Sequence, residues 1–222
     1  MYQKQEPVSF GDLTVRQFID ILSSAEPVPG GGAASALAGA LGASLVAMVA
    51  ALSTGRAKYA AYENTLARCA EAGRDLASEF LRLSNSDAQA YAGYAVALKL
   101  PRETEPQRKV RTAAIQAAAR AASDAPWECV KACGALVTAA EALAGRSNVN
   151  AASDVLVAAL LGEAAARGAA ENVRINLPST GDEDYNETMS QKLDEALHDI
   201  AALASRTRET VLSGRVSDPE DE

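Results

Sequence analysis

The first segment of the chain that could do chemistry is a glycine run ahead of a long uncharged stretch. Residues 27–34 read PVPGGGAA, and no charged residue occurs from Pro27 to Gly55. Glycines let a backbone approach a ligand closely, and free N–H groups at a helix N-terminus favour an anionic or polar group. The spacing matches neither a Walker loop nor GxGxxG after a strand. We therefore expect Gly30, Gly31 and Gly32 either to bind substrate or to form a tight entry turn.

Two further segments carry side chains suited to proton transfer. Lys58 and Tyr59 follow the uncharged stretch, where the chain must turn back, so we expect them near one end of a helical bundle. Asp87, Tyr91 and Tyr94 are spaced i, i+4 and i+7 and share one face of a predicted helix. A lysine at a helix boundary is often merely solvated, and Asp87 could equally serve as an N-cap.

The third polar segment, at residues 147–154, reads SNVNAASD. Helix capping accounts for one or two of these side chains, which leaves Asn148, Asn150 and Ser153 as candidates for substrate binding. Asp154 would be usable as a base near neutral pH if it turns inward among helices. Gln116 stands alone in an alanine run and lies either on the outer face or in a pocket as a hydrogen-bond donor.

The single histidine limits the chemistry that the chain can perform. His198 is far in sequence from the other polar segments, so neither a Ser-His-Asp arrangement nor a histidine-based metal site is expected. Cys69, Cys129 and Cys133 lack metal or CxxC spacing, which predicts buried free thiols. We therefore expect no metal and no cofactor, and a reaction that relies on carboxylates, amides, lysine and tyrosine.

Helical periodicity runs through the chain, and no stretch shows the two-residue alternation of a β-strand. The expected fold class is all-α, as a single domain of about seven to nine helices around a central Ala/Gly-rich helix. The predicted helices cover residues 13–22, the glycines to 53, 56–83, 87–98, 107–122, 126–144, 151–167 and 185–212, and a short apolar segment covers 169–177. We expect an ordered core over about residues 10–213 and a disordered acidic tail at 217–222.

Composition and charge exclude several classes of protein. Alanine is abundant and aromatic residues make up only 5%, which predicts a thin, closely packed helical core. The net charge of -8 argues against a nucleic-acid surface, and the first ten residues lack the apolar region of a secretory signal. The uncharged stretch is long enough to span a bilayer, but Ala, Gly and Ser dominate it. We expect a helix crowded on all sides in a soluble, cytoplasmic protein, with no membrane partner.

Taken in order, these segments resemble the formiminotransferase-cyclodeaminase family. The resemblance is carried by PVPGGGAA at 27–34, GRAKY at 55–59, the Asp87 segment, KLP at 99–101, and NVN with Ser153 and Asp154, and it covers about residues 10–213. It implies an all-helical domain, usually a homodimer, that acts on tetrahydrofolate derivatives.

The resemblance implies one of two reactions. One is hydrolysis of 5,10-methenyltetrahydrofolate to 10-formyltetrahydrofolate, and the other is cyclisation of 5-formiminotetrahydrofolate with release of ammonia. A chain of 222 residues is too short for an added formiminotransferase domain, which favours the cyclohydrolase. The cyclodeaminase and a non-catalytic helical folate-binding or structural dimer are the alternatives.

The methenyl substrate carries a cationic amidinium carbon, so an enzyme must position it, activate a water and stabilise a tetrahedral adduct. We expect Asp154 or Asp87 to act as the base while the other carboxylate pairs with the substrate cation. The glycine turn is expected to hold the pterin or the glutamate. We expect Asn148 and Asn150 to position the ring or the water, and Lys58 with Tyr59 to assist proton transfer.

Overall fold

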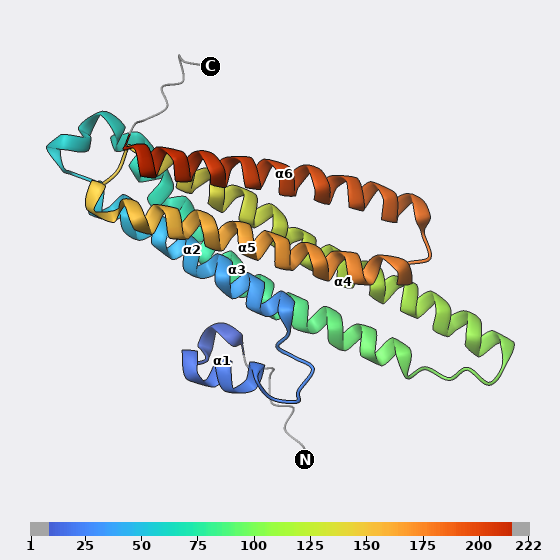
Figure 1. Cartoon of the computed structure of the whole chain (residues 1–222). Helices are drawn as coiled ribbons and strands as arrows, with labels where there is room; N and C mark the ends of the chain where they lie inside the picture. The colour runs from blue at the N-terminus through green and yellow to red at the C-terminus, as the bar shows by residue number, and fades with distance from the viewer. Residues whose placement is uncertain (1–8, 215–222) are drawn as a thin grey trace.

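The computed structural model describes residues 9–214, which are helical throughout apart from short connections (Figure 1). The α-helices are α1 (Val15–Leu22), α2 (Gly31–Ser53), α3 (Glu63–Leu98), α4 (Glu105–Leu143), α5 (Ala152–Asn176) and α6 (Glu183–Ser213). Short 3-10 turns are η1 (Phe10–Asp12), η2 (Ala57–Tyr62), η3 (Val149–Ala151) and η4 (Leu177–Ser179). Residues 9–214 contain no strand, so the all-α prediction is confirmed for them. The predicted disordered tail at 217–222 lies outside the described residues.

The described chain has six α-helices, and the prediction of seven to nine was wrong because three expected breaks do not occur. α3 runs through Ser84 and Ser86, whose hydroxyls donate to the carbonyls of Leu81 (2.7 Å) and Arg82 (3.2 Å) and so point back along the helix. α5 runs through Gly168, where a Cβ atom would overlap the hydroxyl of Ser35 on α2. The missing side chain of Gly168 therefore allows close contact between α5 and α2, and α5 continues through this residue.

The third missing break is at Pro126, which we expected at a helix start and which lies inside α4. Proline has no N–H, so the carbonyl of Ala122, four residues earlier, loses its helical partner. Asn176, the last residue of α5, supplies a replacement, because its Nδ2 donates to that carbonyl at 2.9 Å. A side chain from another helix therefore satisfies the gap and ties α4 to α5.

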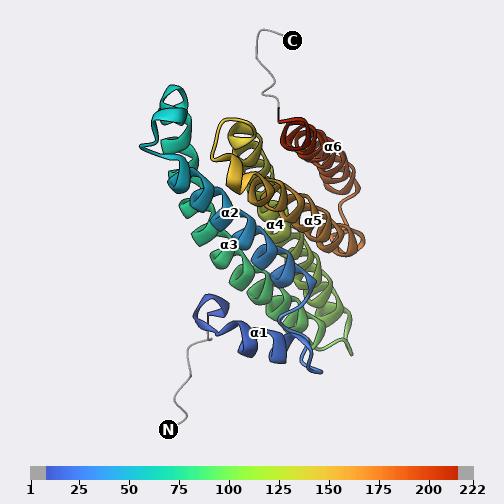
Figure 2. The same ribbon diagram turned by 60° about the vertical axis from the view of Figure 1, so that its left-hand side comes forward.

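The five long helices pack side by side (Figures 1 and 2). α2 packs between α3 and α5, α4 contacts both α3 and α5, and α6 covers α4 and α5. α3 and α4 form a hairpin that reaches past the N-terminal end of α2 (Figure 1). η1 lies against α3, where the backbone N–H of Phe10 donates to Asn85 Oδ1 at 2.9 Å.

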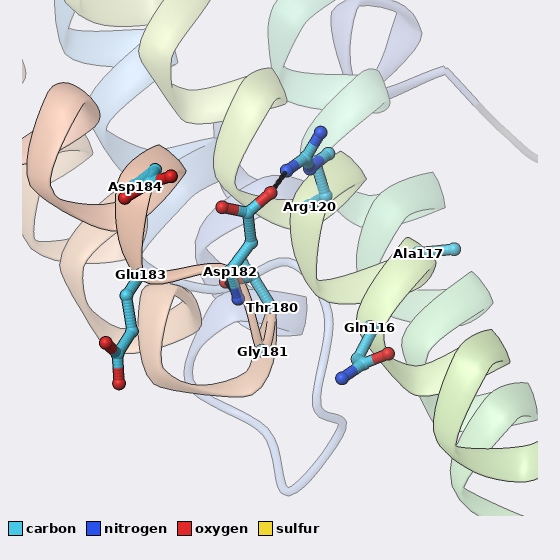
Figure 3. A pocket seen from close by; sticks show the side chains of 8 residues that line it. All are labelled: Gln116, Ala117, Arg120, Thr180, Gly181, Asp182, Glu183 and Asp184. Atoms are coloured by element: carbon cyan, nitrogen blue, oxygen red, sulfur yellow. Dashed lines mark hydrogen bonds and ion pairs between the residues drawn. The ribbon is translucent and has the colours of Figure 1, made fainter. Parts of the chain in front are cut away.

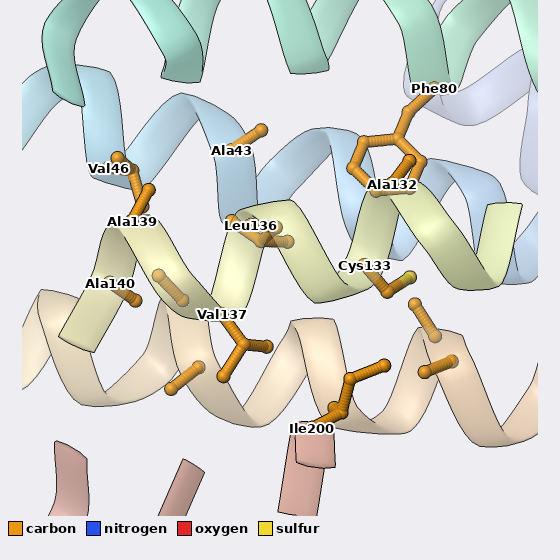
Figure 4. Packing of buried hydrophobic residues seen from close by; sticks show 14 of the residues in the cluster. Ala43, Val46, Phe80, Ala132, Cys133, Leu136, Val137, Ala139, Ala140 and Ile200 are labelled. Atoms are coloured by element: carbon orange, nitrogen blue, oxygen red, sulfur yellow. The ribbon is translucent and has the colours of Figure 1, made fainter. Parts of the chain in front are cut away.

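Small residues let these helices approach closely, as the alanine-rich composition predicts. A Cβ atom at Gly73 of α3 would lie 2.7 Å from the carbonyl oxygen of Ala43 and from the backbone nitrogen of Ala47 on α2. Gly39 of α2 leaves room for the fully buried ring of Phe80. Around these contacts the core is filled mainly by alanine, valine and leucine (Figure 4).

The prediction that the uncharged helix is crowded on all sides was wrong. Leu41, Met48 and Leu52 of α2 are 56%, 39% and 41% exposed, and Val157 and Leu160 of the adjacent α5 are 43% and 39% exposed. We call these five residues the α2/α5 face. By length and composition alone α2 and the segment Val149–Ser179 could cross a membrane, a test that core helices of soluble proteins also pass. Half of the most apolar window of α2 is buried inside the bundle.

Candidate functional site

Asp87 lies against the first turn of α2 and forms the centre of the candidate site. The backbone N–H of Ala33 donates a hydrogen bond to its carboxylate. A Cβ atom at Gly32 would overlap that carboxylate, so the absent side chain of this glycine is what allows the approach. Gly30, Gly31 and Gly32 all have ordinary backbone conformations, since the positive φ angles of the described glycines lie elsewhere. The glycine run therefore lets the Asp87 side chain of α3 approach α2 closely and requires no left-handed turn, and ligand binding by these glycines stays a prediction.

The environment of Asp87 raises the pKa of its carboxyl group above the ordinary value of an aspartate. Burial raises its pKa, and the hydrogen bond from Ala33 opposes that rise without cancelling it. The expectation that Asp87 caps its own helix was wrong, because the residue lies inside α3, and its catalytic role stays a prediction. Asp87 caps the N-terminus of α2 from a neighbouring helix, and it also lines a cavity.

The cavity beside Asp87 has a volume of about 350 Å³ and lies between the glycine turn, α3, α4 and the end of α5. This size is in the range of small-molecule sites, which are typically apolar with a few well-placed polar groups. The lining fits that description: Pro27, Val28, Gly30, Gly31, Asp87, Ala90, Tyr91, Tyr94, Ala122, Asn172, Ile175 and Asn176.

The predicted shared face of Asp87, Tyr91 and Tyr94 is confirmed, because all three residues line this cavity. Tyr91 is 45% exposed, whereas Tyr94 is half-buried. The hydroxyl of Tyr94 donates to the hydroxyl of Ser179 at 3.2 Å and so joins α3 to η4.

Two residues of the cavity, Asn172 and Asn176, were missed in the sequence. They lie in the stretch 169–177 that we took for a short apolar segment, and they are the last polar amides of α5. Their i, i+4 spacing at the end of this helix, which places both amides on one face, was the signal that could have found them.

The other predicted site residues, apart from Gln116, lie at the opposite end of α2. The backbone N–H of Asn148 donates to the buried hydroxyl of Ser53 at 2.7 Å, which places the 147–154 segment beside the C-terminus of this helix. Gly31 and Ser53 are 22 residues apart, or about 33 Å at 1.5 Å per residue. Within one chain, Lys58, Tyr59 and the 147–154 segment therefore do not meet Asp87 and the glycines.

At the C-terminal end of α2, two of the predicted residues, Tyr59 and Asn148, hold the segment 147–154 in place. The hydroxyl of buried Tyr59 accepts from the N–H of Val149 at 3.1 Å, and Asn148 Oδ1 accepts from the N–H of Asn150 at 3.1 Å. The ammonium of exposed Lys58 lies 5.6 Å from the ring centre of Tyr59. Exposed Ser153 and half-buried Asp154 occupy the first turn of α5.

Gln116 is half-buried but lies in a different groove, between α4 and the start of α6 (Figure 3). It faces Gly181, where a Cβ atom would overlap the Gln116 amide, and Arg120 forms an ion pair with Asp182 nearby. Gln116 is not among the residues that line the Asp87 cavity.

The remaining reactive side chains are away from the cavity lining. Cys69, Cys129 and Cys133 are free and buried, as predicted. In residues 9–214, no group of three or more His, Cys, Asp or Glu residues is arranged to hold a metal ion.

Comparisons with known proteins agree with this fold. The chain is 36% identical over 203 residues to methenyltetrahydrofolate cyclohydrolase of Methylorubrum extorquens, which covers 91% of this chain and 98% of that protein. It is 30% identical over 194 residues to formimidoyltransferase-cyclodeaminase of Rattus norvegicus, which covers 87% of this chain and 36% of that protein.

A solved structure is similar over the same length. The crystal structure of formiminotetrahydrofolate cyclodeaminase from Thermotoga maritima superimposes with a TM-score of 0.83 at 28% identity, covering 91% of this chain and 98% of that one. The family model described as Formiminotransferase-cyclodeaminase matches residues 14–195. The chain therefore belongs to the formiminotransferase-cyclodeaminase family.

Proposed function

We propose that this protein hydrolyses 5,10-methenyltetrahydrofolate to 10-formyltetrahydrofolate in the Asp87 cavity. The observation that carries the proposal is the Asp87 carboxyl group, whose pKa is raised by burial and which lines a cavity of suitable size at the end of α2. The similarity to the Methylorubrum extorquens protein, which bears the name of this activity and matches over nearly its whole length, supports the same reaction.

In the proposed mechanism, the Asp87 carboxylate lies near the cationic methenyl carbon and accepts a proton from a water molecule. The water oxygen bonds to that carbon and gives a neutral tetrahedral adduct. The bond from this carbon to N5 then breaks, Asp87 returns its proton to N5, and the hydroxyl proton of the adduct leaves to solvent as the formyl group forms on N10. General acid-base assistance of this kind contributes roughly 10² to 10⁴ in rate.

Cyclodeamination of formiminotetrahydrofolate is the second candidate function. The names of the rat and Thermotoga maritima relatives favour it, and the same cavity would hold its substrate. The reaction requires a proton donor for the departing ammonia. A carboxyl group with a raised pKa retains its proton to higher pH than an ordinary aspartate and suits this role as well.

We further propose that the protein is a homodimer that pairs through the α2/α5 face. Exposed leucine, methionine and valine side chains on two adjacent helices are what a second apolar surface would cover. In this dimer the twofold axis passes through the middle of the face and is perpendicular to α2. The N-terminal end of one α2 then lies beside the C-terminal end of the other. That arrangement brings Lys58 and Asp154 of the partner subunit toward the Asp87 cavity.

The two reactions are separated by the near-ultraviolet absorbance of methenyltetrahydrofolate. Purified protein is added first to this compound and then, separately, to formiminotetrahydrofolate. Loss of the absorbance with the first and no gain with the second establishes the cyclohydrolase, whereas a gain with the second establishes the cyclodeaminase. Inactivity toward both contradicts the enzymatic proposals and leaves the non-catalytic folate-binding or structural dimer.

A further inference from the structure

The side-chain amide of Asn176 is held in one orientation at the edge of the Asp87 cavity. Its Nδ2 donates to the carbonyl of Ala122 at 2.9 Å and to the carbonyl of Asn172 at 2.7 Å. An amide nitrogen has two protons, so both are used. The reversed orientation would set Oδ1 against two carbonyl oxygens, which cannot donate, and is therefore excluded.

The helix defect at Pro126 explains why this orientation is available. In a regular helix the Ala122 carbonyl would accept from the backbone N–H of residue 126, and Pro126 lacks that group. The free carbonyl is what binds the first Nδ2 proton of Asn176. The proline thus creates a fixed anchor for a side chain that lines the cavity.

Asn172 is oriented in a similar way, one helical turn earlier. Its Nδ2 donates to the carbonyl of Gly168 at 2.8 Å, and this nitrogen lies 3.5 Å from the Cβ position of Gly31 in the glycine turn. Within residues 9–214, no hydrogen bond to Oδ1 of Asn172 or Asn176 is present. Both residues line the cavity, and each retains an amide oxygen that can accept a hydrogen bond.

The polar groups of the cavity therefore form a pattern that selects a ligand. Asn172 and Asn176 add two neutral acceptors to the Asp87 carboxylate, while the Tyr94 hydroxyl is already committed to Ser179. The remaining donors are the Tyr91 hydroxyl and the backbone N–H groups in the first turn of α2 other than that of Ala33, which have no partner within the helix. A 2-amino-4-oxo-pyrimidine ring matches this pattern, since its 2-amino group and N3–H donate and its 4-oxo group accepts.

We propose that Asn172 and Asn176 bind the 2-amino and N3–H edge of the pterin through their Oδ1 atoms. This assignment rests on the proposed folate function and adds the direction in which the substrate lies. The pyrimidine edge points to the end of α5, the 4-oxo group to the first turn of α2, and the reacting one-carbon bridge to Asp87. Asn172 and Asn176 are then specificity-determining residues, and Pro126 is a positioning residue.

The test compares two ligands that differ in one donor, tetrahydrofolate and its 2-desamino-2-methyl analogue. Dissociation constants are measured by calorimetry for the wild-type protein, Asn172→Ala and Asn176→Ala, with Asn64→Ala as a control on the exposed surface of α3. We expect at least one cavity variant to weaken tetrahydrofolate binding about tenfold, in line with one lost hydrogen bond. The same variant should bind the analogue as the wild type does, and Asn64→Ala should change neither constant.

An equal loss for both ligands in each cavity variant, or no loss in either, overturns the assignment. Asn176→Ala leaves the Ala122 carbonyl without a partner, so its melting temperature is measured alongside. If this variant does not fold, Asn172→Ala, which removes no hydrogen bond between helices, decides the outcome. Turnover of methenyltetrahydrofolate by the wild type is recorded separately. Its absence refutes the proposed reaction, whereas an equal loss for both ligands, or no loss, in the binding data refutes only the role of the asparagines.

Discussion

The missing side chain of Gly32 makes the space that the carboxylate of Asp87 occupies. One residue is in the glycine run and the other is 55 positions later in α3, so the contact joins two segments that are independent in sequence. It also joins the N-terminus of α2, which favours a negative charge, to the acid that we propose as the catalytic base.

Replacing Gly32 with alanine should therefore displace Asp87. We expect kcat/KM to fall at least tenfold and the free energy of unfolding to fall by about 1–3 kcal/mol through overpacking. Gly93→Ala is the matched control on α3, since nothing lies within 4 Å of its Cβ position and Gly93 is outside the cavity lining. Steady-state kinetics and thermal denaturation of both variants check this, and equal behaviour of the two would contradict it.

We expect Asp87→Asn to lower the catalytic rate without lowering the stability of the fold. Because the pKa of Asp87 is raised in the folded state, ionisation of this group destabilises the fold as the pH rises through that pKa. Asparagine removes the charge and can still accept from Ala33. We expect a melting temperature at pH 8 equal to or above that of the wild type, together with a rate loss of roughly 10² to 10⁴. Unchanged turnover in the folded variant would refute the role of Asp87.

The pH dependence of the hydrolysis should report the same group. A base must be ionised to accept a proton, so kcat/KM should fall as the pH drops through the raised pKa of Asp87. The midpoint of this decline should lie at a pH above the ordinary aspartate pKa of about 3.9. A pH profile of the wild type measures it. A midpoint at or below the ordinary value would indicate that another group controls the reaction.

A charge on the α2/α5 face should prevent dimer formation. We expect Leu41→Glu to sediment as a monomer, because a buried unpaired carboxylate is costly in an apolar interface. Val110→Glu is the control, since Val110 is 65% exposed on α4 and outside this face. Sedimentation velocity of the wild type and both variants decides the matter. A wild-type monomer, or a Leu41→Glu dimer, would contradict the proposed interface.

Mixing two inactive variants should test whether the two ends of α2 cooperate across subunits. If Asp87 of one subunit works with Asp154 of the other, Asp87→Asn and Asp154→Asn are each inactive alone. Random reassociation of equal amounts gives heterodimers with one intact site, and about a quarter of the wild-type activity should return. Persistent inactivity of the mixture, despite heterodimer formation, or full activity of Asp154→Asn alone would rule out a shared site.

Features that depend on near neighbours in the chain could be predicted from the sequence. The helix predicted from the glycines to residue 53 is present as α2, which begins at Gly31 and ends at Ser53. Thr14 caps α1 with Gln17 in a capping box, an arrangement set by residues three positions apart. The shared face of Asp87, Tyr91 and Tyr94 was also predictable. Each of these rests on helical periodicity or on a side chain reaching its own first turn, which are properties of a few consecutive residues.

What only the tertiary structure decided is which segments meet. The sequence by itself determined the helical class, the small-residue core and the polar segments that could do chemistry. It placed Asp87 and Asp154 in one site, but the length of α2 separates them within a chain. It took Pro126 for a helix start, whereas Asn176 from another helix satisfies the carbonyl that the proline leaves free. Such partners are far apart in sequence, and they meet only because α2, α4 and α5 pack in one particular register.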